Sequence, residues 1–313
     1  MLWSRTLLGL LVLLATAAAA LPAPAPSAHP SFVPVQSAIA PTAPTSAAAL
    51  LQPLAGAALN VSVHMSLNFS VSVGYHPAPS NSSAGNSTAP PPVPCSDPRG
   101  CPDLLVDASK LVTAGVTPEK LAASNCNVVE GSTQAGARRL LRFTFTTPNF
   151  GDGDLIIGDP ALHPEWFEWG LCHSHWHFRE YAAYRLWTVP GYLQWQTARS
   201  QDPNATADQV LAAHPELQSA YLAGHKQGFC AKDVVWYVIA LPGHYGSCDE
   251  QGISVGWADE YNAYLDGQFV DVTGVPPGPY VLEAEVNPHH FYIEKSYSNN
   301  SGALVLVLPP PLG

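Results

Sequence analysis

The sequence from residue 95 to about residue 309 predicts a mainly β fold: an antiparallel β-sandwich core with long disulfide-tied loops and one short helix. Its length of about 215 residues suits a single domain. Short apolar runs recur between Gly, Pro, Asn and Asp residues, which is the pattern of short strands joined by turns. All six cysteines lie in this region, and in a secreted chain they indicate disulfides.

Seven segments have the length and composition of strands. Residues 140–145 are patterned as a half-buried strand, because Arg142 and Thr144 alternate with Leu141 and Phe143. Only residues 207–225 look helical, with apolar side chains at helix-like spacing. The predicted strands are 104–106, 140–145, 181–188, 234–241, 268–272, 280–286 and 304–308.

Residues 1–20 read as a secretory signal. Arg5 provides a basic start, residues 7–14 an apolar stretch and residues 17–20 a small-residue cleavage zone. We therefore expect a protein secreted to the extracellular space, the matrix or a cell wall. The apolar run is too short for a membrane span and no later stretch qualifies, so no membrane association is expected after cleavage.

Residues 21–94 predict a mostly disordered arm ahead of the domain at 95–313. The arm contains no Asp, Glu, Lys or Arg and is rich in Ala, Pro and Ser, a composition that cannot form an ordinary core. One part differs, because residues 60–73 alternate apolar with polar side chains and predict a strand. Four N-x-Ser/Thr sequons suit an exposed glycoprotein segment, and they begin at Asn60, Asn68, Asn81 and Asn86.

The charged residues are concentrated in the predicted domain. Of the 13 basic and 24 acidic residues, only Arg5 precedes residue 95, so the remaining part carries a formal net charge of −12. An acidic surface attracts cationic partners and argues against binding to nucleic acid. Many secreted proteins are acidic for solubility alone, so the charge supports this choice of partner but does not establish it.

Three histidines alternate within residues 172–177, which read Cys-His-Ser-His-Trp-His. Residues two apart in an extended segment share a face, so His173, His175 and His177 project together. An ideal strand would leave the outer pair too far apart for one metal at about 2.0–2.1 Å per bond, so the segment must bend or one histidine is not a ligand. Imidazole is the commonest transition-metal donor, and the pattern predicts a metal site rather than a strand with surface histidines.

Other side chains offer weaker signals. Lys226 lies among glycine, aromatic and cysteine residues, where a buried amine would be nucleophilic, although most lysines are solvated. Tyr261 is ordinary in isolation, because most tyrosines pack in the core.

The sequence contains no G-x-S-x-G, Walker, dinucleotide-binding or H-E-x-x-H motif, which excludes several enzyme classes. Oxygen donors near the end suit either calcium or a plain turn: Glu294, Ser296, Asn299 and Asn300.

The cysteine spacing assigns one disulfide. Cys95 and Cys101 are close enough in sequence to close a small loop at the domain entrance. Spacing alone leaves three pairings open for the other four cysteines, which are Cys126, Cys172, Cys230 and Cys248.

An ordered set of motifs surrounds the histidines. Residues 169–178 carry the triplet, residues 224–230 read Gly-His-Lys-x-x-Phe-Cys around Lys226, and Gln-Gly-Ile-Ser at 251–254 precedes Tyr261. Over about residues 101–308 this set resembles the catalytic domain of the lysyl oxidases, and the ordered series is far more specific than the triplet alone. The further matching segments are 102–104, 139–143, 271–273, 277–282, 286–288 and 297–300.

The resemblance implies a copper amine oxidase whose cofactor, lysine tyrosylquinone, is made from its own side chains. His173, His175 and His177 would bind Cu(II), and Lys226 would add as a neutral amine to the oxidised ring of Tyr261. The enzyme would oxidise primary amines, including peptidyl lysine or a small amine, with O2 to aldehyde, H2O2 and ammonia. The catalytic base is left open among three carboxylates, which are Asp259, Asp266 and Asp271.

The resemblance also implies a calcium site and a disulfide pattern. Ser296 stands where an aspartate is usual, so the calcium site should be weakened. Cys172 would pair with Cys248, leaving Cys126 and Cys230 as a pair or as two free thiols. The family's disulfide around the cofactor tyrosine is absent, because Trp257 and Gly267 occupy its positions. The implied calcium ligands are Asp103, the Leu104 carbonyl, Glu294, Asn299 and Asn300.

Two other functions remain open at this stage. The proline-rich arm and the missing disulfides also suit a non-catalytic extracellular matrix or wall-binding protein with the same fold. The three histidines could instead hold zinc and a water molecule in a zinc-dependent hydrolase. A quinone adduct at Tyr261 excludes the first alternative, and zinc without quinone absorbance favours the second.

Overall fold

The computed structural model describes residues 71–73, 95–179, 181–226, 229–239 and 241–311. The predicted signal at 1–20 lies outside the described residues, as does the predicted arm apart from Val71–Val73. Within the described part, no helix is both long and apolar enough to cross a membrane.

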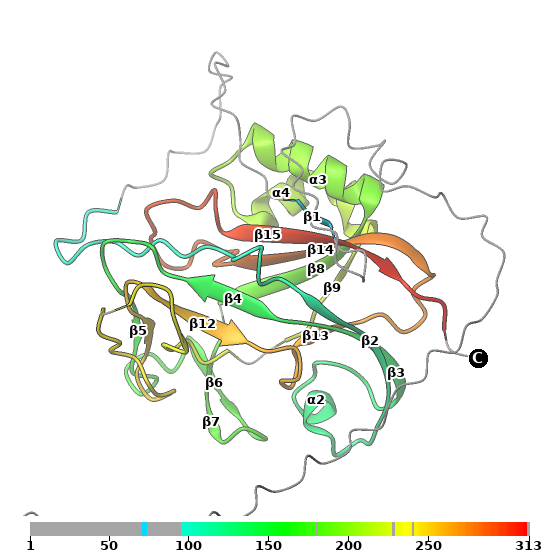
Figure 1. Ribbon diagram of the computed structural model, residues 1–313, viewed down its shortest axis with the longest axis horizontal. Helices are drawn as coiled ribbons and strands as arrows, with labels where there is room; N and C mark the ends of the chain where they lie inside the picture. The colour runs from blue at the N-terminus through cyan, green and yellow to red at the C-terminus, as the bar shows by residue number, and fades with distance from the viewer. Residues whose placement is uncertain (1–70, 74–94, 180, 227–228, 240, 312–313) are drawn as a thin grey trace, which may run out of the picture. The chain divides into compact units, whose positions relative to one another are not determined.

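One layer of the domain is a five-stranded antiparallel sheet (Figure 1). Its central strands pair in register, with Leu282 opposite both Leu186 and Leu304. The edge strand β1 is the only described part of the predicted strand at 60–73, and it pairs with β15. In spatial order the strands are β1 (Val71–Val73), β15 (Ser301–Leu308), β14 (Gly278–Val286), β8 (Ala182–Thr188) and β9 (Tyr221–Ala223).

Smaller antiparallel sheets pack against one face of this sheet. Two of them have three strands, in the orders β13-β3-β2 and β10-β12-β4, and two are two-stranded, β11-β5 and β6-β7. Their strands are β2 (Thr113–Leu121), β3 (Gly136–Phe143), β4 (Phe145–Pro148), β5 (Leu155–Gly158), β6 (Phe167–Gly170), β7 (His175–Phe178), β10 (Val235–Trp236), β11 (Gln251–Ile253), β12 (Trp257–Tyr261) and β13 (Phe269–Asp271).

The main core lies between these layers. Leu186, Leu282 and Leu304 from the large sheet share one buried cluster with Phe143 of β3 and Phe145 of β4. A core shared between the inner faces of two packed sheets is what a sandwich requires. The prediction of a mainly β, antiparallel fold with disulfide-tied loops is confirmed.

Some predicted strands are shorter than expected or divided. The run at 140–145 crosses two sheets, because Thr144 leaves β3 and donates its backbone N–H to the Val112 carbonyl before β4 begins. The run at 234–241 contains only the two-residue strand β10. The run at 104–106 contributes a single bridge, from Leu104 to Asn149.

Helices cover the other face of the large sheet (Figure 1). The predicted helix at 207–225 is wrong in extent: α4 (Ala207–Ala213) starts from a Thr206 capping box, and Pro215 then opens the 3-10 turn η2 (Pro215–Ser219). The longer α3 (Val189–Gln201) was not predicted, because its apolar residues have almost no helical periodicity. The remaining helix among the described residues is the single turn α2 (Cys126–Val129).

A buried charge network joins α3 to the large sheet. Arg185 on β8 donates to Glu285 at 2.7 Å, and Glu283 accepts from the indole N–H groups of Trp187 (2.8 Å) and Trp195 (2.7 Å). The side chains of Arg185, Glu283 and Glu285 are all nearly fully buried. These charges are therefore stabilised by one another and by hydrogen bonds rather than by water.

The disulfides differ from those implied by the resemblance. Cys95–Cys101 forms as predicted, but the other bonds are Cys126–Cys172 and Cys230–Cys248, so the expected pairs Cys172–Cys248 and Cys126–Cys230 are wrong. The Gly252 N–H donates to the Ala231 carbonyl at 3.0 Å, which brings the segment containing Cys248 beside Cys230. Cys172 instead lies against α2.

Candidate functional site

The histidine segment forms a hairpin. Strands β6 and β7 pair with Gly170 opposite His175, and the turn between them is closed by the Ser174 N–H donating to the Gly170 carbonyl at 2.8 Å. Ser174 adopts a left-handed φ of 53°. His173 therefore lies in the turn and not on the strand, which provides the bend that a shared metal requires.

The three imidazole rings are brought together. Their ring centroids are 4.8 Å apart for His175 and His177, 5.3 Å for His173 and His177, and 5.6 Å for His173 and His175. Gly170 lies beneath the His177 ring, where any Cβ would overlap it. The absence of a side chain at Gly170 thus makes room for that ring.

The nitrogen positions fit a bound transition metal. His175 Nδ1 lies 3.0 Å from the His173 carbonyl oxygen, so it carries the proton and leaves Nε2 as a lone-pair donor. His175 Nε2 and His177 Nε2 are 3.2 Å apart. Two metal–nitrogen bonds of about 2.0–2.1 Å at a tetrahedral angle would separate the nitrogens by about 3.3 Å.

Both histidines are electrically neutral near pH 7. Burial, followed by the charges of the neighbouring His175 and His173, lowers the pKa of His177 to about 4. Burial, followed by the charge of His173, also lowers the pKa of His175. Neutral imidazoles are the form that binds metals.

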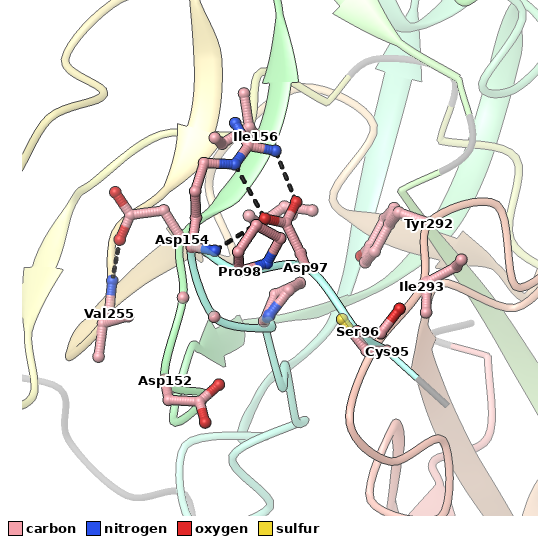
Figure 2. A pocket seen from close by; sticks show the side chains of 15 residues that line it. Cys95, Ser96, Asp97, Pro98, Asp152, Asp154, Ile156, Val255, Tyr292 and Ile293 are labelled. Carbon is pink, nitrogen blue, oxygen red and sulfur yellow. Dashed lines mark hydrogen bonds and ion pairs between the residues drawn. The ribbon is translucent and has the colours of Figure 1, made fainter. Parts of the chain in front are cut away.

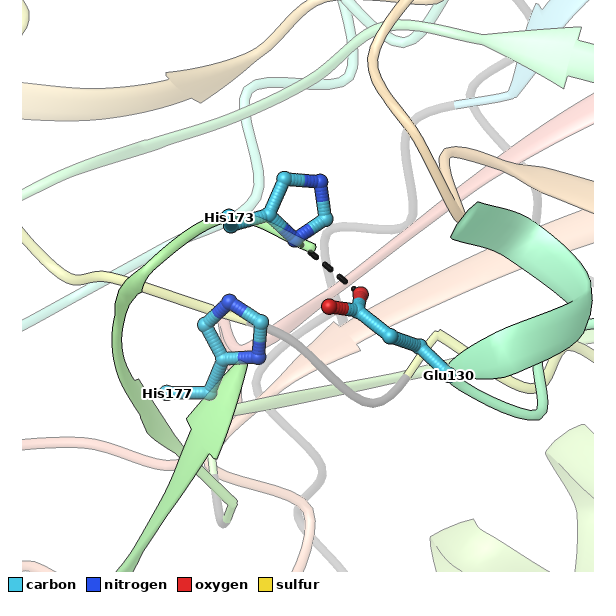
Figure 3. A group of neighbouring side chains, drawn as sticks. All are labelled: Glu130, His173 and His177. Atoms are coloured by element: carbon cyan, nitrogen blue, oxygen red, sulfur yellow. Dashed lines mark ion pairs between the residues drawn. The ribbon is translucent and has the colours of Figure 1, made fainter. Parts of the chain in front are cut away.

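A carboxylate that the sequence did not suggest completes this group. Glu130 follows α2, and its Oε2 lies 3.0 Å from His173 Nδ1 (Figure 3). Its Oε1 accepts the Cys172 N–H at 3.1 Å. Donor atoms of Glu130, His173 and His177 all lie within 4.8 Å of one another. The sequence did not indicate Glu130, because the Cys126–Cys172 disulfide that brings α2 beside His173 was not among the expected pairs.

The predicted cofactor residues also lie together. Lys226 Nζ is 5.4 Å from the ring centroid of Tyr261 and 5.3 Å from that of Phe229. Tyr261 ends β12, and its ring is packed edge-on against Phe229 and stacked on Phe145. Burial lowers the pKa of Lys226 to about 8, against the opposing charges of nearby carboxylates. The amine and the phenol thus face each other inside an aromatic site, although 35 positions separate them in the sequence.

Asp259 is the base candidate nearest the phenol. It lies two residues before Tyr261 on β12, so the two side chains share a face of the strand. Among the described residues, neither the Tyr261 hydroxyl nor Asp259 Oδ2 has a hydrogen-bond partner of normal geometry, and both are buried. Burial raises the pKa of Asp259 to about 7, and its charge adds to burial in raising the pKa of Tyr261.

The other two base candidates have different contacts. Asp271 accepts hydrogen bonds from the hydroxyls of Thr133 and Thr273. Asp266 lies between the two halves of the site, because its Oδ2 is 3.4 Å from His173 Nε2 and its carbonyl accepts from Lys226 Nζ at 2.9 Å. Asp266 therefore links the histidine cluster to the lysine.

The residues of the expected calcium site converge as well. Glu294 is buried and accepts from the Leu104 N–H (2.7 Å) and the Asn300 amide (2.7 Å), and Asp103 accepts from the Asn299 amide (3.1 Å). Burial raises the pKa of Glu294 to about 7. The amide oxygens of Asn299 and Asn300 are buried without a donor among the described residues. These free oxygens fit a hard cation.

A cavity of about 670 Å³ lies elsewhere and contains none of the predicted copper or cofactor residues (Figure 2). Its acidic side chains already have partners: Asp97 pairs with Arg99, Asp152 with Lys295 and Asp154 with His244. We assign it no part in the candidate site.

Comparison with known proteins agrees with this arrangement. The model of the family described as Lysyl oxidase matches residues 108–193 and 209–307. The chain is 31% identical to lysyl oxidase homolog 1 of Homo sapiens over 215 residues, which cover 64% of this chain and 32% of that protein. It is 30% identical to the protein-lysine 6-oxidase of Bos taurus over 225 residues, which cover 64% of this chain and 44% of that protein. The matched region therefore spans less than half the length of either relative.

Proposed function

Because the chain belongs to the lysyl oxidase family, we propose that it is a secreted copper amine oxidase that converts primary amines, chiefly protein lysine side chains, to aldehydes. Its co-substrates would be O2 and water, and its other products H2O2 and ammonia. The observation that carries the proposal is the position of Lys226 Nζ over the Tyr261 ring, beside three convergent histidines.

His173, His175 and His177 would hold the copper ion, and Lys226 and Tyr261 would form lysine tyrosylquinone. Together these groups supply an electron acceptor for the amine and a route for those electrons to O2. The surrounding protein sets the protonation state of the Lys226 amine. With a pKa of about 8, roughly one tenth of the Lys226 amine is neutral at pH 7, whereas an ordinary lysine is almost wholly protonated. Only the neutral amine can form the bond to the ring.

Asp259 would accept the α-proton of the substrate amine. Its carboxylate is buried beside Tyr261, and a pKa raised to about 7 matches a general base working near neutral pH. Phe145 and Phe229 hold the Tyr261 ring and keep water from it. The net charge of −12 outside residues 1–94 favours cationic, lysine-bearing partners.

The same proposal extends to the expected calcium ion and to the location of the protein. Asp103, Glu294 and the free amide oxygens of Asn299 and Asn300 would hold calcium, with Ser296 contributing no charge. Three disulfides support an extracellular location, because such bonds persist in oxidising compartments.

Mass spectrometry of the protein produced with copper tests the central step. We expect a covalently joined pair of peptides, one containing Lys226 and the other Tyr261, and a phenylhydrazine adduct on the Tyr261 peptide. Separate, unmodified peptides in a copper-loaded protein would refute the amine oxidase. Bound zinc without a quinone would favour a hydrolase instead.

Replacing Asp259 with asparagine tests the assignment of the base. We expect turnover per quinone to fall by about 10²–10⁴-fold. Because only the deprotonated carboxylate accepts a proton, the wild-type rate should rise with pH up to about 7 and then level off. The Asp259→Asn variant should lose this rise. Steady-state kinetics between pH 5 and pH 9, normalised to phenylhydrazine-reactive quinone, measures both effects.

Asp271→Asn is the matched control for this experiment, because Asp271 is bonded to two threonines. It should keep the wild-type pH profile. If Asp259→Asn retains the rise in rate below pH 7, another group is the base.

A further inference from the structure

We infer that Glu130 is a fourth protein ligand of the metal centre, binding through Oε2 beside His173, His175 and His177. The inference rests on the proposed copper site and adds a residue that neither the histidine motif nor its spacing indicates. Glu130 lies 42 residues before Cys172 and reaches the histidines only through the tertiary fold.

The two oxygens of Glu130 have different surroundings. Oε1 accepts the backbone N–H of Cys172 at 3.1 Å, which fixes the direction of the carboxylate. Oε2 faces His173 Nδ1 at 3.0 Å, and the carboxylate as a whole lies beside His173 and His177 (Figure 3). The side chain is only 14% exposed, so a free negative charge here would be poorly hydrated. A cation at Oε2 removes this penalty.

The contact between Glu130 and His173 is not an ordinary hydrogen bond. His173 Nδ1 lies 3.0 Å from Oε2, yet it is buried and has no hydrogen-bond partner among the described residues. Two donors bound to one metal at about 2.0–2.1 Å are themselves separated by about 3 Å. The pair therefore has the spacing of two ligands without the alignment of a donor and an acceptor.

The other nitrogen of His173 completes the assignment. Nε2 lies 3.4 Å from Asp266 Oδ2, and Asp266 Oδ1 accepts from the Asn127 amide at 3.0 Å. A metal-bound histidine usually donates its second N–H to a carboxylate, which orients the ring. Nδ1 of His173 is thus the donor to the metal, and Asp266 is the positioning residue behind it.

Helix α2 positions both carboxylates that contact His173, Asp266 and Glu130. Asn127 on the helix holds Asp266, and Glu130 caps its end. The Cys126–Cys172 disulfide ties the start of α2 to the histidine turn. The resulting set of three nitrogens and one carboxylate oxygen is typical of Cu(II) rather than Cu(I), which prefers sulfur ligands.

The test compares full-length wild-type protein with Glu130→Gln after metal removal and titration with Cu(II). Glutamine keeps the shape and the acceptor for the Cys172 N–H but removes the charge. We expect the Kd for Cu(II), measured by competition with a chelator, to rise by at least about tenfold. We also expect altered g and hyperfine values in the Cu(II) EPR spectrum. Glu130→Asp, which is shorter, should show the same loss.

Glu165→Gln is the matched control, because Glu165 also faces a histidine, His163, but is 63% exposed. It precedes β6 at the end of the hairpin where Phe167 pairs with Phe178, opposite to the histidine turn. This variant should bind Cu(II) as the wild type does.

Equal Kd and EPR values for Glu130→Gln and wild type would overturn the inference, as would a higher Kd with an unchanged EPR spectrum. If the wild type and His175→Ala bind copper equally poorly, the copper site itself is refuted. An unchanged melting temperature of the metal-free Glu130→Gln protein confirms that folding is intact.

Discussion

Replacing Lys226 with alanine should abolish both the covalent link to Tyr261 and amine-dependent release of H2O2. Lys226 Nζ is the amine that lies over the Tyr261 ring, at 5.4 Å from its centroid. Without this amine the bond to the ring cannot form, so turnover should fall below detection, by at least about 10³-fold. A coupled peroxidase assay with a primary amine substrate measures the activity, and peptide mass spectrometry measures the link.

Two further variants separate the chemistry from the fold. Lys226→Arg keeps the positive charge, but its guanidinium stays protonated and cannot attack the ring, so it should be as inactive as Lys226→Ala. Lys120→Ala removes an exposed lysine of β2 and should leave activity unchanged. Peroxide production by Lys226→Ala at the wild-type rate would show that the lysine has no part in the cofactor.

Replacing Arg185 with methionine should give the largest loss of stability. Methionine has a similar length but leaves Glu283 buried without its cation, while Glu285 keeps only Arg199. Removing one partner of a buried ion pair typically costs about 3–5 kcal/mol. For a domain of this size the melting temperature should fall on the order of 10 °C. Differential scanning calorimetry and urea unfolding measure the change.

An exposed ion pair of the same type is the control. Arg179 lies 3.6 Å from Glu168, with half of its side chain in solvent. Arg179→Met should change stability by less than about 1 kcal/mol. A second variant tests the cause, because adding Glu283→Gln to Arg185→Met removes the carboxylate left without a cation and should restore part of the loss. Equal melting temperatures for the two arginine variants would show that the buried network does not stabilise the domain.

Local patterns in the sequence were sufficient for much of the fold. The strands around residues 182–188, 278–286 and 301–308 were anticipated because their side chains are strongly apolar and end at Gly, Pro or Asn. The helix at 189–201 was missed, because tertiary packing of Trp195 against Trp187 stabilises it rather than a periodic apolar face. The same difference between local and distant interactions applies to the site.

The candidate side chains of the proposed site came from the sequence alone: three alternating histidines, and a lysine and a tyrosine within an ordered set of motifs. These identities are local properties, because the type and spacing of residues decide which donors and nucleophiles are available. The disulfide partners, the approach of Lys226 to the Tyr261 ring, and the approach of Glu130 to His173 depended on the tertiary structure. Such contacts join segments tens of residues apart, and strand pairing and burial, which no short stretch of sequence encodes, bring them together.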